Sequence, residues 1–356
     1  MRLQLTFLPP QKELLEIAFS RARKQAEKIG GQGTKLQKSK QKATQKVITA
    51  AAYFTEKLQQ AVKGFPSMQK IHPFYRELIE ATVDLEAMLR ALGQMSAARR
   101  ITDRLKGQYI GKIRSLGKGE EKRAAGLVSE FYGRLASLAK SMDKGITAYN
   151  ENAKKMLELP NIKFDLPTAI IAGYPNTGKT TILSRLTKSK PKIAAYPFTT
   201  QYLQIGYLTQ NYFEFQLIDT PGLLDRPLLK RNKIERKAIA ALQHLANAIV
   251  FVVDPTTRCG FELEKQVNLF NEIKSEFKET KILIVLNKAD IASKEEMQAA
   301  KEAFGKETII EGQGIRSKLR EKIVQSLKKT TEPMQLEKTA ESMEEKKPSG
   351  SQAASN

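Results

Sequence analysis

Eight consecutive residues near the middle of the chain constrain its fold more than any other stretch: Gly173-Tyr174-Pro175-Asn176-Thr177-Gly178-Lys179-Thr180. They fit the pattern G-x-x-x-x-G-K-[ST]. The apolar run 169–172 predicts a short buried strand before them, and residues 181–186 predict the start of a helix after them. A loop between a strand and a helix can point successive backbone N–H groups at phosphate oxygens, because glycine allows the necessary curl. The stretch predicts a phosphate-binding loop; its alternative is the ordinary glycine turn of a β-α unit.

Individual residues of this stretch have separate expected roles. Lys179 is expected to reach the terminal phosphates, and Thr180 to ligate Mg²⁺. Asn176 has two open interpretations: with carbonyls of a switch segment it could hold K⁺, or it could only satisfy the backbone of the loop. The nucleotide-binding candidates here are Gly173, Tyr174, Pro175, Asn176, Thr177, Gly178, Lys179, Thr180 and Thr181.

Two later segments have the order and spacing of nucleotide-sensing switches. The apolar run 213–218 predicts a strand that ends in Asp219-Thr220-Pro221-Gly222, where Asp219 would hold Mg²⁺ through water and the Gly222 N–H would meet a γ-phosphate. A threonine in Tyr196-Pro197-Phe198-Thr199-Thr200 could also ligate the metal. Leu223 stands where many switch proteins carry a glutamine that orients the attacking water. We therefore expect hydrolysis to be slow, or to use another group in place of the glutamine.

The strand 281–286 runs into Asn287-Lys288-Ala289-Asp290. The Asp290 carboxylate can accept hydrogen bonds from the N1–H and 2-amino group of guanine, whereas adenine offers no such donors. The motifs together predict a GTPase, with Lys179, Thr200, Gly222 and Asn176 as catalytic candidates and Thr180, Thr200 and Asp219 as metal ligands. A base-contacting turn is expected near 308–310, where its usual motif is degenerate.

Charge separates the N-terminal part of the chain from the rest. The whole chain carries a net charge of +22, and residues 1–160 hold 30 basic and 15 acidic residues, which gives 30 − 15 = +15. Apolar residues at helical spacing predict an antiparallel bundle of about four or five helices there. They fall in three sets: Ile48, Ala51, Thr55, Leu58 and Val62; Phe74, Leu78, Leu85, Leu89 and Leu92; and Leu127, Phe131, Leu135, Leu138 and Met142.

Two basic sets in this bundle suggest a polyanionic partner, most simply RNA bound through its phosphates. No acidic residue lies between Lys28 and Thr55, and a single Asp103 lies within the second set. The alternatives are a flexible basic loop, for the first set, and a solvated lysine-rich surface. The sets are Lys35, Lys38, Lys40, Lys42 and Lys46, and Arg99, Arg100, Arg104, Lys106, Lys112 and Arg114.

The remaining composition excludes several classes of protein. A single Cys259 excludes a disulfide framework and fits a reducing compartment, and two histidines exclude a multi-histidine metal site. No apolar run approaches the roughly 20 residues that span a bilayer, and the first ten residues are too broken for a signal peptide. These observations predict a cytoplasmic protein that does not bind membranes. The protein is also expected to be a monomer.

The expected fold class is a P-loop α/β domain, with a mainly parallel sheet and helices on both faces, preceded by an all-α bundle. The hairpin around Gln210-Asn211 predicts one antiparallel edge strand. The expected boundaries are 1–160 for the basic bundle, 161–328 for the GTPase domain and 329–356 for a disordered tail.

These motifs resemble those of the Obg-like GTPases and, within them, the nucleolar GTP-binding protein 1 family and its archaeal counterparts. Residues outside the nucleotide motifs carry the sharper likeness: 71–75, 225–235, 241–245 and 259–270. The resemblance implies a role in large-ribosomal-subunit assembly, with the helical domain on ribosomal RNA and with ribosomal proteins or assembly factors as further partners. It favours Thr200 over Thr199 as the metal-sensing residue. The short polar C-terminal segment favours an archaeal-type member, with nucleolar localisation only in a eukaryote.

Two other functions remain open at this stage. One is a regulatory GTPase whose helical domain binds a protein and whose basic charge is incidental. The other is a mainly structural RNA-binding protein with incidental GTP hydrolysis.

Overall fold

The computed structural model describes residues 4–30, 33–187, 191–196, 202–210, 213–227, 231, 233–305, 308–311, 317 and 319–327. Their contacts divide the chain into two compact units. The helical unit comprises Arg2–His72 and Thr82–Glu158. The sheet unit comprises Pro73–Ala81 and Leu159 onward. The predicted tail 329–356 lies outside the described residues, and no helix among those described is both long and apolar enough to cross a membrane.

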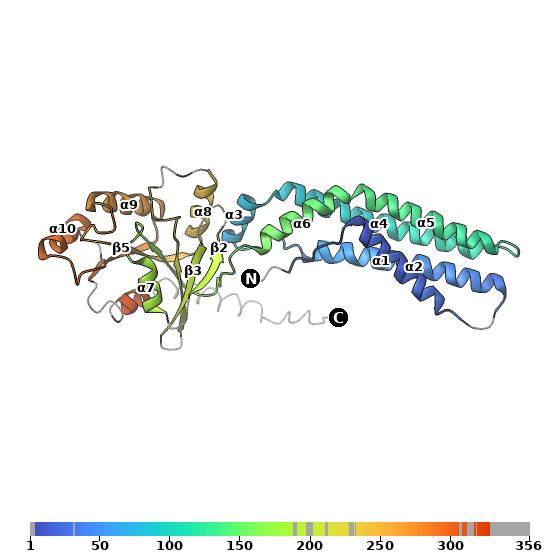
Figure 1. Cartoon of the computed structure of the whole chain (residues 1–356), viewed down its shortest axis with the longest axis horizontal. Helices are drawn as coiled ribbons and strands as arrows, with labels where there is room; N and C mark the ends of the chain where they lie inside the picture. Colours follow the sequence, from blue (N-terminus) through green and yellow to red (C-terminus); the bar gives the residue numbers. More distant parts are fainter. Residues whose placement is uncertain are drawn as a thin grey trace, which may run out of the picture. The chain divides into compact units, whose positions relative to one another are not determined.

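The helical unit is built from long helices that lie side by side (Figure 1). A capping box begins the second of them: Thr34 accepts from the Gln37 N–H at 3.2 Å while the Gln37 side chain accepts from the Thr34 N–H at 2.8 Å. The apolar face of each helix is buried against the others, with Phe54 and Phe131 fully inaccessible. The helices are α1 (Gln11–Glu27), α2 (Lys35–Gly64), α4 (Leu85–Ser115), α5 (Glu121–Ser141) and α6 (Asp143–Leu157).

Several predictions for this unit need correction. Residues 74–92 form two helices, because the chain breaks at Asp84, whose side chain caps α4 by accepting from the Ala87 N–H at 2.9 Å. Leu89 is therefore 47% exposed, and Ile48 on α2 is 39% exposed, so neither is a core residue. The first basic set lies in the regular helix α2, where the capping box favours helix over a flexible loop.

The short helix α3 (Pro73–Thr82) packs within the sheet unit although it lies between two helices of the helical unit in sequence. The Tyr75 hydroxyl donates to the Pro160 carbonyl at 2.6 Å and accepts from the Ile162 N–H at 3.3 Å. The Phe74 ring lies 5.9 Å from the ring of Phe164 and 6.4 Å from that of Tyr196. The predicted division at residue 160 assigns α3 to the bundle, whereas these aromatic contacts join it to the sheet unit.

The sheet has seven strands in the order β2-β3-β4-β1-β5-β6-β7. All pairs from β4 to β7 are parallel, while β2 pairs antiparallel to β3, and β3 to β4. Among the described strands only β3 therefore runs against the others, which agrees with the predicted single antiparallel strand. It is not the edge strand, because the edge is formed by β2, a short strand that the sequence pattern did not indicate. The strands are β1 (Thr168–Ala172), β2 (Lys192–Ala195), β3 (Tyr202–Gln210), β4 (Phe213–Asp219), β5 (Ala246–Val253), β6 (Lys281–Leu286) and β7 (Thr308–Glu311).

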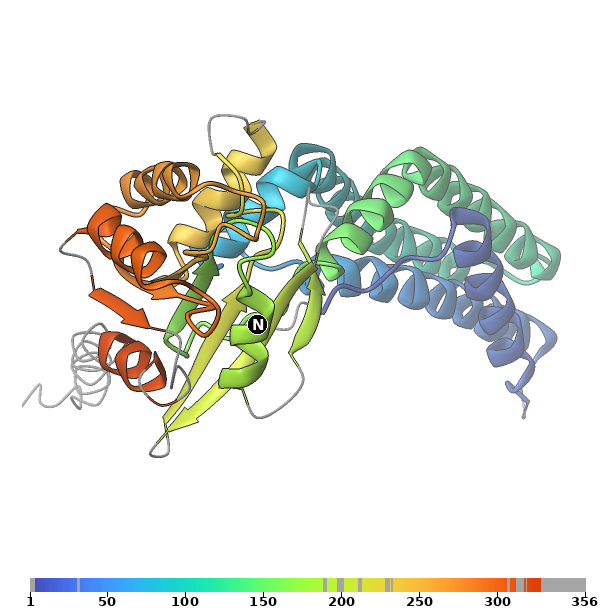
Figure 2. The ribbon, with the colours of Figure 1, turned by 60° about the vertical axis from the view of Figure 1, so that its left-hand side comes forward.

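Helices cover both faces of this sheet (Figure 2). One face packs against α7 through Leu183 and against the helical residues 319–327 through Ile323, around Val250 of β5. On the other face the Phe251 ring meets Phe270 of α9 at 5.5 Å and Phe304 of α10 at 6.2 Å. The predicted α/β fold, mainly parallel and covered on both faces, is confirmed. The helices of this unit, besides α3, are α7 (Lys179–Leu186), α8 (Lys233–Gln243), α9 (Leu263–Glu276) and α10 (Lys294–Phe304).

The central strand β1 has β4 on one side and β5 on the other. The chain leaves β1 toward β2 and β3 on one side of the sheet, and leaves β5 toward β6 on the other side. Such a reversal places a ligand-binding crevice at the carboxyl ends of these strands. The stretch 173–180 begins there.

Candidate functional site

The phosphate loop leaves the fully buried strand β1 and enters α7. Gly173 has a φ of 132° and Gly178 a φ of 98°, a backbone region that side chains with a Cβ rarely adopt. Space is also absent: a Cβ on Gly173 would collide with the Val252 carbonyl, and one on Gly178 with Nδ2 of Asn287. Gly173 is therefore required by conformation and by its close approach to backbone, whereas Gly178 is required mainly by conformation, since the atom it would meet is the end of a side chain.

Lys179 lies inside the loop and is only 7% exposed. Its Nζ donates to the carbonyls of Gly173 and Tyr174, both at 2.8 Å. Burial lowers the pKa of this ammonium, while the carboxylates of Asp219 and Asp225 oppose that shift. The side chain is thus held across the loop by carbonyls, with carboxylates in its electrostatic neighbourhood.

Other loop residues fix the backbone. The Thr177 hydroxyl donates to the Tyr174 carbonyl at 2.9 Å. The Tyr174 ring stacks on Phe261 of the segment before α9, with centroids 4.1 Å apart. Asn176 has a φ of 61° and lines the cavity described below. Its role in binding a cation stays a prediction.

Thr180 and Asp219 form the core of the predicted metal site. The Thr180 hydroxyl donates to Oδ2 of Asp219 at 2.7 Å, while the buried Oδ1 of Asp219 has no hydrogen-bond partner in the described part of the chain. Burial raises the pKa of Asp219, and the Thr180 bond and the Lys179 charge pull it down. An unpaired buried carboxylate oxygen beside a hydroxyl suits Mg²⁺, which takes few protein ligands and completes its shell with phosphate and water. The described residues contain no group of three His, Cys, Asp or Glu side chains that could hold a metal.

The segment after Asp219 is folded back on itself by two charged residues. The Gly222 N–H donates to Oδ2 of Asp225 at 2.6 Å. The buried Arg231 donates to the Gly222 carbonyl at 2.7 Å and to the Leu223 carbonyl. Leu223 itself is fully buried, and its apolar side chain offers no hydrogen-bonding group to water or phosphate. Asp225 and Arg231 lie in the segment 225–235 that carries the family likeness, but the sequence pattern predicted no role for either residue.

The base-side motif is tied to the phosphate loop. Asn287 Nδ2 donates to the Thr177 carbonyl at 2.8 Å. Lys288, at a φ of 57°, donates to Oδ2 of Asp254 at 2.6 Å. Burial alone would raise the pKa of Asp254, but the Lys288 ammonium and the Thr256 donors hold it below its ordinary value. The sequence analysis did not identify Asp254. Its position directly after an apolar strand could have indicated it.

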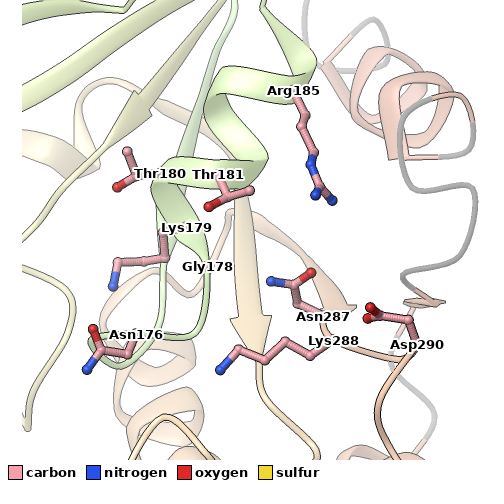
Figure 3. A pocket seen from close by; sticks show the side chains of 9 residues that line it. All are labelled: Asn176, Gly178, Lys179, Thr180, Thr181, Arg185, Asn287, Lys288 and Asp290. Carbon is pink, nitrogen blue, oxygen red and sulfur yellow. The ribbon is translucent and has the colours of Figure 1, made fainter.

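The loop and the base-side motif line one cavity of about 600 Å³. Figure 3 shows Asn176 and Lys179 at one end and Asp290 at the other, with Asn287 between them. Arg185 of α7, which sequence reasoning missed, also lines it. The lining residues are Asn176, Gly178, Lys179, Thr180, Thr181, Arg185, Asn287, Lys288 and Asp290.

Some predicted site residues lie elsewhere. The cavity is not lined by Gly173, Tyr174, Pro175 or Thr177, which belong to the loop, or by Asp219 and Gly222. Asp219 adjoins it through its hydrogen bond with Thr180. Thr199 and Thr200 lie outside the described residues. The base turn is expected near 308–310, but these residues form strand β7, and residues 312–316 after it lie outside the described part of the chain.

Two family models match parts of this chain. Residues 3–163 match the NOG1 N-terminal helical domain, and residues 233–290 match Nucleolar GTP-binding protein 1 (NOG1). An uncharacterised protein of Methanocaldococcus jannaschii is 39% identical over 254 residues, covering 71% of this chain and 70% of that protein.

Eukaryotic relatives are longer than this chain. Nucleolar GTP-binding protein 1 of Drosophila melanogaster is 31% identical over 304 residues, which are 85% of this chain and 46% of the relative. The Saccharomyces cerevisiae protein of that name is 32% identical over 292 residues, which are 81% of this chain and 44% of the relative. The chain therefore spans less than half the length of these two relatives.

Among solved structures, one of a Plasmodium falciparum protein described as nucleolar GTP-binding protein 1 has 30% identity and a TM-score of 0.40. It covers 52% of this chain and 97% of its own. The G domain of the T. maritima FeoB iron transporter has 25% identity and a TM-score of 0.36, covering 45% of this chain and 98% of its own.

Proposed function

Because the chain belongs to the nucleolar GTP-binding protein 1 family, we propose that it binds GTP and hydrolyses it slowly to GDP and phosphate. One observation carries this proposal: the phosphate loop and Asp290 line opposite ends of one cavity. A nucleoside triphosphate extended along it would have its phosphates on the loop and its base at Asp290.

Asp290 provides the preference for guanine. Its carboxylate would accept from two donors on the guanine edge, N1–H and the 2-amino group. Bound ATP would leave that carboxylate desolvated and unpaired, which costs at least about 1–3 kcal/mol, or about 5- to 150-fold in affinity. Asn287 supports this discrimination, since its bond to the Thr177 carbonyl ties the base-side motif to the loop.

Hydrolysis would depend on residues other than a water-positioning glutamine. Leu223 is buried and apolar and cannot orient water. Bound Mg²⁺ would neutralise phosphate charge, held by Thr180 and Asp219 and, as the resemblance implies, Thr200. The remaining devices are Lys179, the Gly222 N–H and Asn176 with a monovalent cation. This set is smaller than in activated switches, so the intrinsic rate should be low.

The binding proposal is tested by displacing a fluorescent GTP analogue from the full-length chain with GTP, GDP and ATP. GTP and GDP should compete at least about five-fold better than ATP. The Lys179→Ala variant should lose triphosphate binding, whereas Lys294→Ala, an exposed lysine on α10, should not. Equal competition by ATP would contradict the proposal.

We further propose that the helical unit binds ribosomal RNA. The two basic sets, far apart in sequence, meet at one end of this unit: Lys40 Nζ donates to the Arg114 carbonyl at 2.8 Å, and the Ser39 hydroxyl donates to the Glu121 carbonyl at 3.0 Å. The nearby carboxylates of Asp103 and Glu120 are already paired, with Lys106 and Arg123. The exposed cations that remain for phosphates include Lys35, Lys38, Lys42, Arg104, Lys112 and Arg114.

A neutralised triple variant tests this surface in the full-length chain. Changing Lys38, Lys42 and Lys112 to Gln should weaken binding to purified large-subunit rRNA. Each phosphate contact contributes about 0.7–0.9 to the slope of log affinity against log salt, so loss of three contacts should reduce the slope by about 2 to 3. The matched control changes three exposed lysines of the sheet unit, Lys278, Lys281 and Lys294. An equal effect of both variants would contradict an RNA surface on the helical unit.

The cellular role that the family resemblance implies is that of a GTP-controlled factor in assembly of the large ribosomal subunit. Co-sedimentation with large-subunit particles should then differ between GTP and GDP. Failure to co-sediment in either state would instead favour a regulatory GTPase with a protein partner. Particle association and growth that survive loss of GTP binding in Lys179→Ala would favour a mainly structural RNA-binding protein.

A further inference from the structure

We propose that the Asp225 carboxylate competes with the γ-phosphate of GTP for the Gly222 N–H, and so sets the relative affinity for GTP and GDP. The inference rests on the proposed GTP binding and adds to it a residue of the chain that opposes the triphosphate. Asp225 belongs to none of the nucleotide motifs that the sequence displays.

The contact is short and shielded. The Gly222 N–H lies 2.6 Å from Oδ2 of Asp225, and Asp225 is buried. A backbone N–H supplies a single donor, and the predicted role of this one is to meet a γ-phosphate oxygen. A carboxylate oxygen and a phosphate oxygen are both anionic acceptors for the same proton. Only one of them can hold it.

Asp225 also shares the electrostatic surroundings of the phosphate site. Its charge acts on both Lys179 and Asp219, the residues expected at the terminal phosphate and at the metal. A γ-phosphate would add negative charge to a region that already contains two carboxylates. GDP would add none there, because its last phosphate is the β-phosphate. The repulsion and the occupied N–H therefore both act against GTP and spare GDP.

Arg231 holds this arrangement together. Its guanidinium donates to the carbonyls of Gly222 and Leu223 and lies 3.7 Å from Oδ1 of Asp225. The arginine side chain is fully buried, whereas its partner carboxylate is 10% exposed. The residues 222–225 thus form a closed turn with an arginine bound to its carbonyls. Opening of that turn would free the Gly222 N–H and move Leu223 at the same time.

The test measures the dissociation constants of GTP and GDP separately for the full-length chain, by calorimetry or by a fluorescent analogue under non-hydrolysing conditions. Asp225→Ala should raise the preference for GTP over GDP by about ten-fold, the size expected for one charge-assisted hydrogen bond. The affinity for GDP should stay within about two-fold. Asp225→Asn keeps an acceptor but loses the charge, and should shift the preference in the same direction by less.

Two controls keep the result interpretable. Asp165→Asn, an exposed carboxylate of the same unit, should leave the preference unchanged. Hydrogen exchange of the Gly222 amide should become faster in Asp225→Ala, which shows that the bond existed in solution. An unchanged or lower GTP preference in both Asp225 variants would overturn the inference while leaving GTP binding intact. Failure of the unaltered chain to bind either nucleotide would overturn the proposed function and this inference together.

Discussion

Replacing Tyr75 with phenylalanine should loosen helix α3 from the sheet unit. The hydroxyl that is lost makes two bonds to the chain after α6: it donates to the Pro160 carbonyl at 2.6 Å and accepts from the Ile162 N–H at 3.3 Å. The ring stays, so the contacts with Phe74 and Phe164, at 5.4 and 5.1 Å between centroids, should be retained. The substitution therefore isolates the hydrogen bonds from the packing.

The magnitude follows from burial. Tyr75 and Ile162 are at most 2% exposed, and a buried backbone group that loses its partner costs about 1–3 kcal/mol. The bond at 2.6 Å should account for most of the loss and the longer one for less. We expect the free energy of local opening of α3 to fall by about 2 kcal/mol in total, which corresponds to about a 30-fold increase in the opening equilibrium constant.

Hydrogen exchange of the α3 amides in the full-length chain is the appropriate assay, because it reports local opening without assuming two-state unfolding of a two-unit protein. Exchange over residues 76–81 should be about 30-fold faster in Tyr75→Phe. The control is Tyr202→Phe, which alters a ring that is 58% exposed on β3. A change below about three-fold, or one equal to the control, would refute the assignment of α3 to the sheet unit through these bonds.

Further predictions concern the nucleotide site. Gly173→Ala should abolish nucleotide binding in a fluorescence titration, because the added Cβ meets the Val252 carbonyl, while Gly126→Ala on α5 has open space and should bind normally. Asp290→Asn should weaken GTP binding by about 10- to 100-fold and improve binding of xanthosine triphosphate, whose 2-carbonyl can accept from the new amide. Chelation of Mg²⁺ by EDTA should weaken GTP binding at equilibrium, and unchanged affinity would contradict the roles of the metal ligands. If Asn176 helps to hold K⁺, GTP hydrolysis should be faster in potassium than in sodium, and equal rates would remove that role.

Contiguous motifs made much of the site predictable. The phosphate loop requires glycines and a lysine at fixed spacing between a strand and a helix, so residues 173–180 indicated both chemistry and local structure. Asp219 and Asp290 follow apolar strands whose parallel pairing brings their carboxyl ends to one edge. Long, strongly periodic helices were visible for the same reason: their pattern repeats over many residues.

Contacts between distant residues were not predictable in this way. The pairing of Lys288 with Asp254 spans 34 residues, and nothing in either local pattern indicates the partner. Asp225 accepts a hydrogen bond from Gly222, only three residues away. The donor is a backbone N–H, which nearly every residue has, so the sequence does not single out this partner. Leu89 satisfied the helical spacing and is nonetheless exposed, since periodicity cannot show that a cap at Asp84 restarts the helix with a new phase.

The place of α3 has a consequence for how the protein is made. Tyr75 and the carbonyl it binds are 85 residues apart, and at about 5–20 residues per second the second is synthesised about 4–17 seconds after the first. During that interval α3 leaves the ribosome before Pro160 and the sheet residues that follow it have been made. The helices on either side can pair before the sheet exists, but α3 must wait for it. We therefore expect the nascent chain to expose Phe74 and Tyr75 to chaperones until the first residues of the sheet unit emerge.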